Sequence, residues 1–329
     1  MSDAATDIRS TKSTASGKAG TDVRPKVSVI SLTYNQADFV RRALEGMVSQ
    51  QTDFPFEVVI HDDASTDGTA DIIREYQARY PDIIKPILRT ENLFSKERSL
   101  RTVIRQVVDA TQGEYIANCE GDDYWTDPYK LAKQAAILDA HPEVSMVYTN
   151  FKRVDENDEE LVSDTYVDIQ KDYESGALFA RMIDNNFPLT VSIMERREVF
   201  YHPVLLSCPE QYDYTMACSS ALAGELYFLP EVTCAYRQNR ESFTFRHHGI
   251  MTANDAIVRY HFTRAYLKEP QWRKSGEYHR RIMRSIAGIM VRKRLMMRGK
   301  FYKLLLTTPA LWPYIPGALL GKLTGRKSG

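Results

Sequence analysis

The chain has 329 residues, 43% of them hydrophobic, with 43 Lys and Arg balanced by 43 Asp and Glu. This length and composition are typical of a soluble globular protein with one large domain and an appendage. No apolar stretch reaches the roughly twenty residues that a membrane-spanning helix needs, which excludes a membrane span. The four cysteines show no paired spacing, which indicates core thiols in a reducing compartment rather than zinc ligands.

The first 25 residues are rich in Ser, Thr, Ala, Asp, Gly and Lys. They contain no apolar core, so they predict a disordered tail over residues 1–25 rather than a signal peptide. We therefore expect a cytoplasmic protein.

Strand patterns and helix patterns then alternate along the chain. Short β-rich runs are each followed by apolar residues that recur with a helical period. The predicted strands are residues 26–32, 57–60, 84–88, 114–119 and 144–148, and the predicted helices are residues 39–48, 70–78, 100–108 and 127–138. This alternation predicts a parallel sheet covered by helices on both faces. Beyond Phe151 the pattern mixes short strands and helices, and residues 155–160 read as a solvated acidic loop.

Acidic residues follow the strand predicted at residues 57–60. Asp62 and Asp63 come directly after this strand, and we expect Ser65 and Asp67 to cap the helix that follows. Ligands of open α/β sheets bind outside the carboxyl ends of the strands. Asp62 and Asp63 are therefore expected at the edge of such a crevice.

A cluster of carboxylates also ends the strand predicted at residues 114–119. Glu120, Asp122 and Asp123 lie within four residues. Two like charges about 4 Å apart repel by roughly 4 kcal/mol at an effective dielectric constant near 20, so the cluster needs solvent, hydrogen bonds or a cation. Mg²⁺ and Mn²⁺ bind one or two carboxylates together with substrate phosphate oxygens. The alternative is a solvated acidic turn that caps the next helix.

Three motifs in a fixed order carry a family resemblance. They are Val27-Ser28-Val29-Ile30-Ser31-Leu32-Thr33-Tyr34-Asn35, Asp62-Asp63-Ala64-Ser65-Thr66-Asp67-Gly68-Thr69 and Glu120-Gly121-Asp122-Asp123. Together they resemble family 2 glycosyltransferases of the GT-A fold. The resemblance implies an α/β, Rossmann-like domain over residues 26–240, with a mostly parallel central sheet flanked by helices. Residues 241–329 would be a basic, mainly helical C-terminal extension.

The resemblance implies a site for a nucleotide-sugar donor, for which we expect a UDP-sugar. Thr33 and Tyr34 match positions that cradle the nucleotide base. Asp63 matches an acid that contacts the base or the ribose, and Arg89 resembles an arginine near the base and the diphosphate. These four residues are the predicted contacts of the nucleoside half of the donor.

The same resemblance implies a metal and diphosphate site. Glu120 and Asp122 stand where the family has its DXD motif, which makes Asp122 the expected ligand of Mg²⁺ or Mn²⁺ and Asp123 a helper. Glu replaces the commoner Asp at the first position. Arg237 resembles an arginine that closes over the donor phosphates, although Asn239 replaces the histidine of that segment.

An inverting transfer needs one carboxylate that accepts the proton of the acceptor hydroxyl while a metal stabilises the departing nucleoside diphosphate. The resemblance places this base near residues 210–214 and favours Asp213 over Glu210 as the catalytic residue. A helix N-cap is the alternative role for Asp213. Thr190 and Ser192 either face the acceptor or belong to an ordinary strand.

The C-terminal segment is strongly basic, with fourteen Lys and Arg and one Glu from residue 273 to the end. Three arginines share one helical face opposite four apolar residues: Arg281, Arg284 and Arg292 against Ile282, Met283, Ile286 and Met290. Such a helix is expected to lie on an anionic membrane surface, at the inner face of the cell membrane. The alternatives are a helical extension with a solvated basic face and a dimer contact. No nucleic-acid recognition motif accompanies the charge.

The sequence thus predicts an inverting, metal-dependent glycosyltransferase that moves a sugar from a nucleotide-sugar to a bacterial surface-glycan acceptor, which we expect to be lipid-linked. One alternative is a nucleotidyltransferase of related fold, which would want a Gly-rich phosphate loop after the first strand. The other is a non-catalytic nucleotide-sugar or membrane-binding scaffold, which would tolerate the loss of Asp213.

Overall fold

The computed structural model describes residues 24–97, 99–161, 170, 172–238, 248–268, 279–280, 282–284, 286–287 and 309–315. Most of the predicted tail and most of the basic segment lie outside these residues. Among the residues named above, Asn239, Arg281, Met290 and Arg292 lie outside them.

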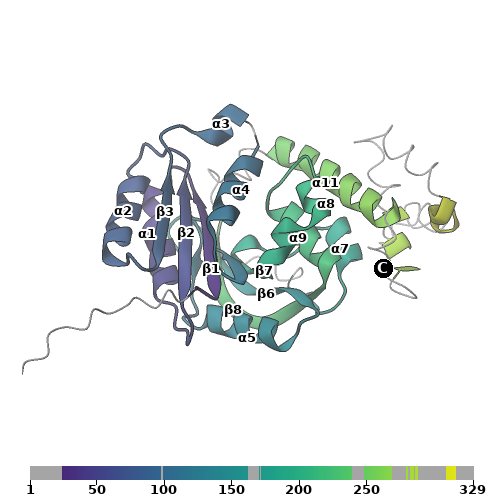
Figure 1. Ribbon diagram of the computed structural model, residues 1–329, viewed down its shortest axis with the longest axis horizontal. Helices are drawn as coiled ribbons and strands as arrows, with labels where there is room; N and C mark the ends of the chain where they lie inside the picture. The colour runs from purple at the N-terminus through teal and green to yellow at the C-terminus, as the bar shows by residue number, and fades with distance from the viewer. Residues whose placement is uncertain are drawn as a thin grey trace, which may run out of the picture.

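A mixed sheet of eight strands forms the centre of the molecule, in the order β3-β2-β1-β4-β7-β6-β8-β5 (Figure 1). The strands are β1 (Val27–Thr33), β2 (Phe56–Asp62), β3 (Ile84–Leu88), β4 (Tyr115–Asn118), β5 (Tyr124–Trp125), β6 (Val144–Val154), β7 (Met194–Arg196) and β8 (Glu225–Arg237). The first four strands are parallel to one another, as the sequence predicts. Beyond them the sheet is mixed, because β7 pairs antiparallel with both β4 and β6.

Helices cover the sheet on both faces. They are α1 (Ala37–Val48), α2 (Thr69–Arg79), α3 (Leu93–Glu97), α4 (Arg101–Ala110), α5 (Lys130–Ala140), α7 (Phe179–Asp184), α8 (Pro203–Leu206), α9 (Asp213–Ala223) and α11 (His248–Lys268), with short 3-10 turns η1 (Thr190–Ser192), η2 (Arg197–Tyr201) and η4 (Pro309–Tyr314). In Figure 1, α1 and α2 lie on one side of the parallel strands, and α4 lies on the other. The helices α7, α8, α9 and α11 form a second group beyond α4.

The apolar faces read from the sequence form one core. On α1, Val40, Leu44 and Met47 recur at helical spacing and are fully buried. On β2, Val58 and Ile60 are fully buried as well. Burying each such side chain contributes about 1.5–3 kcal/mol, so this packing fixes the positions of the strand ends. Among the described residues, no helix has the length and hydrophobicity needed to cross a bilayer.

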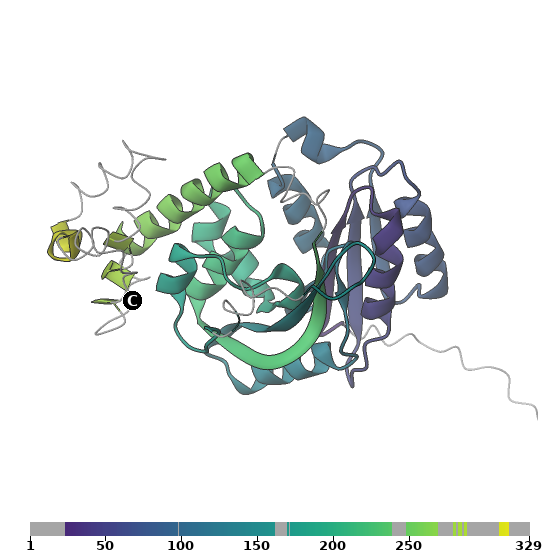
Figure 2. The same ribbon diagram turned by 180° about the vertical axis from the view of Figure 1, so that it is seen from behind.

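The long strand β8 carries distant residues to the end of β4. It pairs in parallel with β6 over shifts in register, and it curves strongly along the lower edge of the molecule (Figure 2). Near its end, the Arg237 backbone N–H donates to Asp123 Oδ1 at 2.8 Å. The curvature therefore joins the end of β8 to the acidic turn after β4.

Candidate active site

The turns after β1 and β2 are tied to each other. Asn35 N donates to Ser65 Oγ at 2.8 Å, and Thr66 N donates to Asn35 Oδ1 at 2.9 Å. Asn35 and Ala64 have positive φ angles of 50° and 63°, a conformation that costs a non-glycine residue free energy. The two turns are thus held in strained positions at the carboxyl edge of the sheet.

The N-cap of α2 is Gly68, so neither predicted cap residue holds that position, although Asp67 accepts from the first residue of the helix. Asp67 Oδ1 accepts from the Thr69 backbone N–H at 3.0 Å at the start of α2, and Asp67 Oδ2 accepts from Ala37 N at 2.9 Å at the start of α1. The prediction for Ser65 is wrong, because its hydroxyl donates to Asp62 instead. Asp67 therefore hydrogen-bonds the first residues of α1 and α2, and Ser65 stabilises the turn after β2.

The residues predicted to contact the nucleotide-sugar differ in solvent exposure. The Thr33 hydroxyl is buried and donates to His61 O at 3.0 Å and to Asp62 Oδ1 at 3.2 Å. Asp63 is buried too, and its carboxylate accepts from the backbone N–H groups of the first two residues of α3, at 2.8 and 3.0 Å. Tyr34 is 48% exposed at the end of β1. The side chains of Thr33 and Asp63 are thus bonded within the protein, whereas the Tyr34 ring is open to a ligand.

Arg89 follows β3, and its backbone N–H donates to Asp62 O at 3.0 Å. Its Nε atom is buried without a hydrogen-bond partner in the part of the chain that the structure describes, as is Nε2 of His61. The charge of Arg89 also acts on His61, whose pKa is lowered, chiefly by burial. An unmade buried hydrogen bond costs about 1–3 kcal/mol, so two such atoms at one strand edge indicate a place for a polar ligand. His61 was not among the residues predicted from the sequence.

The acidic turn after β4 packs directly against the end of β1. A Cβ atom on Gly121 would clash with Gln36 Oε1 and would lie 2.6 Å from Thr33 Cγ2, so only glycine fits there. The Gln36 side chain also acts on Asp122, whose pKa it lowers. The two predicted motifs therefore meet, with Asp122 held beside the start of α1.

The carboxylates of this turn repel one another. Burial raises the pKa of Glu120 to about 8, and the charges of Asp122 and Asp213 add to the rise. Burial also raises the pKa of Asp122, whereas the charge of Arg237 and the Gln36 side chain lower it. A divalent cation would relieve this repulsion, and carboxylate oxygens suit Mg²⁺ and Mn²⁺. Within the described ranges, no group of three His, Cys, Asp or Glu side chains is arranged as a metal site, so substrate phosphates would have to supply further ligands.

Arg237 packs against the acidic turn that carries Asp122. Its side chain is 2% exposed, and its guanidinium donates to Asp122 O at 2.9 Å, Asp155 O at 2.7 Å and Asp158 Oδ1 at 2.6 Å. The guanidinium also lies 4.7 Å from the ring centre of Phe39. Three of its five N–H donors are thus used inside the protein, where Arg237 fixes the acidic turn; its contact with donor phosphates stays a prediction.

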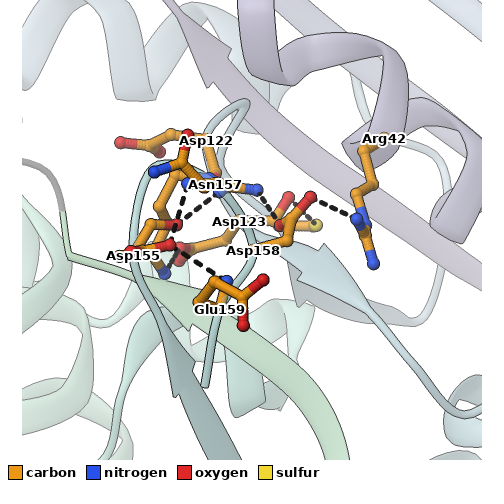
Figure 3. A network of polar contacts seen from close by, with 9 residues as sticks. Arg42, Asp122, Asp123, Asp155, Asn157, Asp158 and Glu159 are labelled. Atoms are coloured by element: carbon orange, nitrogen blue, oxygen red, sulfur yellow. Dashed lines mark hydrogen bonds and ion pairs between the residues drawn. The ribbon is translucent and has the colours of Figure 1, made fainter. Parts of the chain in front are cut away.

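The loop after β6 completes this network (Figure 3). Asp155 Oδ1 accepts from the backbone N–H groups of Asn157 and Glu159, at 2.8 and 2.9 Å. Asp158, at a φ of 68°, bonds both Arg237 and Arg42 of α1. The expected solvated acidic loop is confirmed for its four exposed residues, Glu156, Asn157, Glu159 and Glu160, whereas the half-buried Asp155 and Asp158 accept hydrogen bonds from Arg237.

Asp213 is the first residue of α9, and Tyr212 holds the N-cap position. The Thr190 hydroxyl donates to Asp213 Oδ2 at 3.3 Å. Burial raises the pKa of Asp213, and its negative charge in turn raises the pKa of Glu120 across the site. Asp213 thus faces the acidic turn, whereas Glu210 precedes the helix and accepts through its backbone carbonyl from Thr215 Oγ1 at 3.1 Å.

Two residues that follow the acidic motif in the chain donate hydrogen bonds to the turn that carries Thr190. Trp125 Nε1 donates to Val191 O at 3.1 Å, and Gln134 Nε2 donates to Ser192 O at 2.9 Å. Ser192 itself is fully buried, and its hydroxyl donates to Leu189 O, so the expectation that it faces an acceptor is wrong. The strand interpretation is wrong for both residues, because they form a 3-10 turn, which has no period that the sequence displays. For Thr190, whose hydroxyl reaches Asp213, a position facing the acceptor stays a prediction.

Comparison with known proteins gives this arrangement a family. The family model described as glycosyl transferase family 2 matches residues 28–202. The chain belongs to this family. It is 36% identical over 244 residues to the uncharacterized protein Rv1520 of Mycobacterium tuberculosis, covering 70% of this chain and 68% of that protein. Membership of this family shows a nucleotide-sugar-dependent glycosyltransferase, and the nucleotidyltransferase and scaffold alternatives are set aside.

Solved structures share the fold. The Staphylococcus aureus TarS fragment 1–349, crystallised with UDP, has a TM-score of 0.57 and 19% identity, covering 85% of this chain and 75% of that one. The mannosyltransferase PcManGT of Pyrobaculum calidifontis, crystallised with GDP-Man and Mn²⁺, has a TM-score of 0.55 and 20% identity, covering 93% of this chain and 89% of that one. These likenesses confirm the α/β GT-A fold of this glycosyltransferase.

A buried carboxyl behind the site was missed by the sequence interpretation. Glu195 of β7 is 1% exposed, and it accepts from Ser220 Oγ at 2.5 Å. Burial raises the pKa of Glu195 to about 7, and the charge of Asp213 adds to the rise. A single Glu in a three-residue strand gives no periodic signal by which it could have been found.

Glu195→Gln is expected to remove part of the pH dependence of this glycosyltransferase's stability. The folded pKa of about 7 lies above the ordinary value of 4.5, so the free energy of unfolding falls as pH rises from about 4.5 to 7. The fall is about 3 kcal/mol. The free energy of unfolding of Glu195→Gln, measured in urea, should therefore increase relative to that of the wild type between about pH 5 and about pH 8. Glu225→Gln, at an exposed position, is the control. An equal difference between wild type and Glu195→Gln at both pH values would contradict the assignment.

Proposed function

We propose that the enzyme is an inverting, metal-dependent glycosyltransferase that transfers a sugar from a nucleotide-sugar to a growing bacterial surface glycan. The observation that carries the proposal is the position of Asp213 opposite the acidic turn, close enough for its charge to raise the pKa of Glu120. A base on one side and a carboxylate cluster on the other are the two groups that a direct displacement requires.

The donor is proposed to bind along the edge formed by the ends of β1, β2 and β3. Tyr34 offers an exposed ring to the base, and Arg89 offers a buried Nε without an internal partner in the described chain. Thr33 would act by holding the end of β2 in place and Asp63 by holding the start of α3, since their side chains already bond within the protein. We expect UDP as the nucleotide, by resemblance of the motifs and by likeness to a structure that contains UDP.

The diphosphate is proposed to lie at the acidic turn. Asp122 would hold Mg²⁺ or Mn²⁺, and Glu120 would lie beside it; a bound cation would neutralise the charge that develops on the departing diphosphate. Two observations fit this role: the repulsion between Glu120 and Asp122, and the effect of Gln36, which favours the ionised form of Asp122. Asp123 and Arg237 would position the turn from behind.

Asp213 is proposed to accept the proton of the acceptor hydroxyl. As that oxygen forms its bond to the anomeric carbon, the bond from this carbon to the diphosphate breaks, and the nucleoside diphosphate leaves with the electron pair. Thr190 keeps the Asp213 carboxylate in place, and the Trp125 indole holds the turn of Thr190. A single base and a single displacement give inversion at the anomeric carbon.

The proposals of a surface-glycan acceptor and of a membrane contact are supported by the sequence. The motif Glu120-Gly121-Asp122-Asp123-Tyr124-Trp125 resembles members that build surface polysaccharides, and a lipid-linked acceptor would make a membrane position useful. The basic segment that would meet an anionic membrane falls mostly outside the described residues, although Trp312 within η4 is 54% exposed. A peripheral position on the inner face of the membrane is part of the proposal.

A donor panel tests the proposed function. The full-length protein is incubated with UDP-glucose, UDP-galactose, UDP-GlcNAc and GDP-mannose, with Mn²⁺, with Mg²⁺ or with EDTA, and release of nucleoside diphosphate is measured. Release from a UDP-sugar that requires the metal is the expected result. Equal release in EDTA would contradict the metal site, and release from GDP-mannose alone would contradict the expected nucleotide.

A further inference from the structure

Helix α11 belongs to the predicted C-terminal extension, yet it packs against the helix that carries Asp213. In both ribbon views α11 runs beside α8 and α9 (Figures 1 and 2). Val258 and Phe262 on α11 are fully buried. This face of the extension is therefore part of the core that surrounds the site, and it is not free to lie on a membrane.

Two charged residues of α11 reach the start of α9. Asp255 Oδ1 accepts from the Tyr212 hydroxyl at 2.7 Å. Arg259 Nε donates to Ile183 O at 3.0 Å, and its guanidinium lies 5.3 Å from the ring centre of Tyr214. Tyr212 and Tyr214 are the neighbours of Asp213 in the chain, and both are nearly fully buried. The backbone on each side of Asp213 is thus fixed by a contact from α11.

The charge of Asp255 also acts on Asp213. Burial is the main reason why the pKa of Asp213 is raised, the hydrogen bond from Thr190 opposes the rise, and repulsion by Asp255 adds to it. From the other sides, Asp213 faces Glu120 of the acidic turn and Glu195 of β7, and its charge raises the pKa of each. Arg259 forms only a long ion pair with Asp255, at 3.7 Å, so the repulsion is incompletely neutralised.

We propose that Asp255 is a positioning residue for Asp213, which fixes the start of α9 through the Tyr212 hydroxyl and places a second negative charge near the carboxylate. This inference rests on the proposed role of Asp213 as base. A base must be ionised to accept a proton, and a neighbouring negative charge makes the base stronger at the cost of moving its ionisation to higher pH. The C-terminal extension would then serve the chemistry as well as any membrane contact.

Two substitutions separate the two effects of Asp255. Asp255→Asn removes the charge and keeps an oxygen that can accept from Tyr212. Tyr212→Phe removes the hydrogen bond and keeps the charge. Asp71→Asn is the control for loss of one charge, because that side chain is 82% exposed on α2. Circular dichroism of the full chain checks that each variant is folded.

The ionisation of Asp213 is followed by NMR on protein with carboxyl-labelled aspartate, in which the Asp213 signal is identified by its loss in Asp213→Asn. In Asp255→Asn the midpoint should move to lower pH, and the acidic limb of nucleoside diphosphate release should move with it. In Tyr212→Phe the midpoint should stay near the wild-type value while release falls by about three- to tenfold. The control should change neither quantity.

A midpoint in Asp255→Asn that is unchanged or moves to higher pH would overturn the proposed effect of the charge. Full activity in Tyr212→Phe would overturn the proposed anchoring. Both results can be told apart from a failure of the proposed function, because in that case Asp213→Asn itself would keep wild-type release. The NMR titration needs no donor, so it decides the question even where turnover is slow.

Discussion

Asp213→Asn is expected to lower transfer by about 10²- to 10⁴-fold, the usual contribution of a positioned general base. Asparagine has the shape of aspartate, and its oxygen can still accept from Thr190 Oγ1, which lies 3.3 Å from the carboxylate. The variant should therefore fold and bind donor while kcat falls. The pH profile of the wild type should rise as Asp213 loses its proton, above the ordinary range of an aspartate because burial raises its pKa.

Glu210→Gln is the matched control for Asp213→Asn. Glu210 lies three residues earlier, outside α9, and it was the other base that the sequence allowed. Its substitution should leave kcat within about threefold of wild type. A large loss in Glu210→Gln together with wild-type turnover in Asp213→Asn would reverse the assignment.

Asp122→Asn is expected to abolish the stimulation by Mn²⁺ or Mg²⁺. Loss of a cation that stabilises the leaving diphosphate costs several kcal/mol of transition-state stabilisation, which is on the order of 10³-fold in rate. Gln36 can still hydrogen-bond the side chain, so the turn should keep its shape. The measurement is nucleoside diphosphate release as a function of metal concentration.

Asp109→Asn serves as the control for Asp122→Asn. Asp109 lies on α4 with its side chain 58% exposed, and its ion pair with Arg105 is of the surface kind that contributes little. Its metal response should match the wild type. An unchanged metal response in Asp122→Asn would show that the cation is held elsewhere or is not needed.

The local patterns in the sequence predicted the first half of the sheet well. The buried strands and amphipathic helices up to residue 140 follow from period and turn chemistry, and the acidic segments lie at strand ends as expected. The second half was less readable, because β7 is three residues long and η1 is a single 3-10 turn. Elements this short are set by contacts with distant residues rather than by their own periodicity.

The site was predicted as a set of residues but not as a set of contacts. The resemblance named Arg237 as a phosphate contact, but the structure turns it inward, because the curvature of β8 brings it against Asp122, Asp155 and Asp158. Glu195 and Asp255 were missed for a related reason. Each interacts with Asp213 across the fold, and no spacing in the sequence connects them to it.

Nucleotide binding and turnover, measured together on the wild type, Asp122→Asn and Asp213→Asn, test the central claim most directly. Calorimetry gives the affinity for UDP with Mn²⁺, and release of nucleoside diphosphate from the active donor gives kcat. We expect the wild type to bind and turn over, and Asp213→Asn to bind like the wild type while kcat falls by about 10²- to 10⁴-fold. Asp122→Asn should lose the metal-dependent part of binding. Wild-type turnover in Asp213→Asn, or wild-type affinity for UDP with Mn²⁺ in Asp122→Asn, would contradict it.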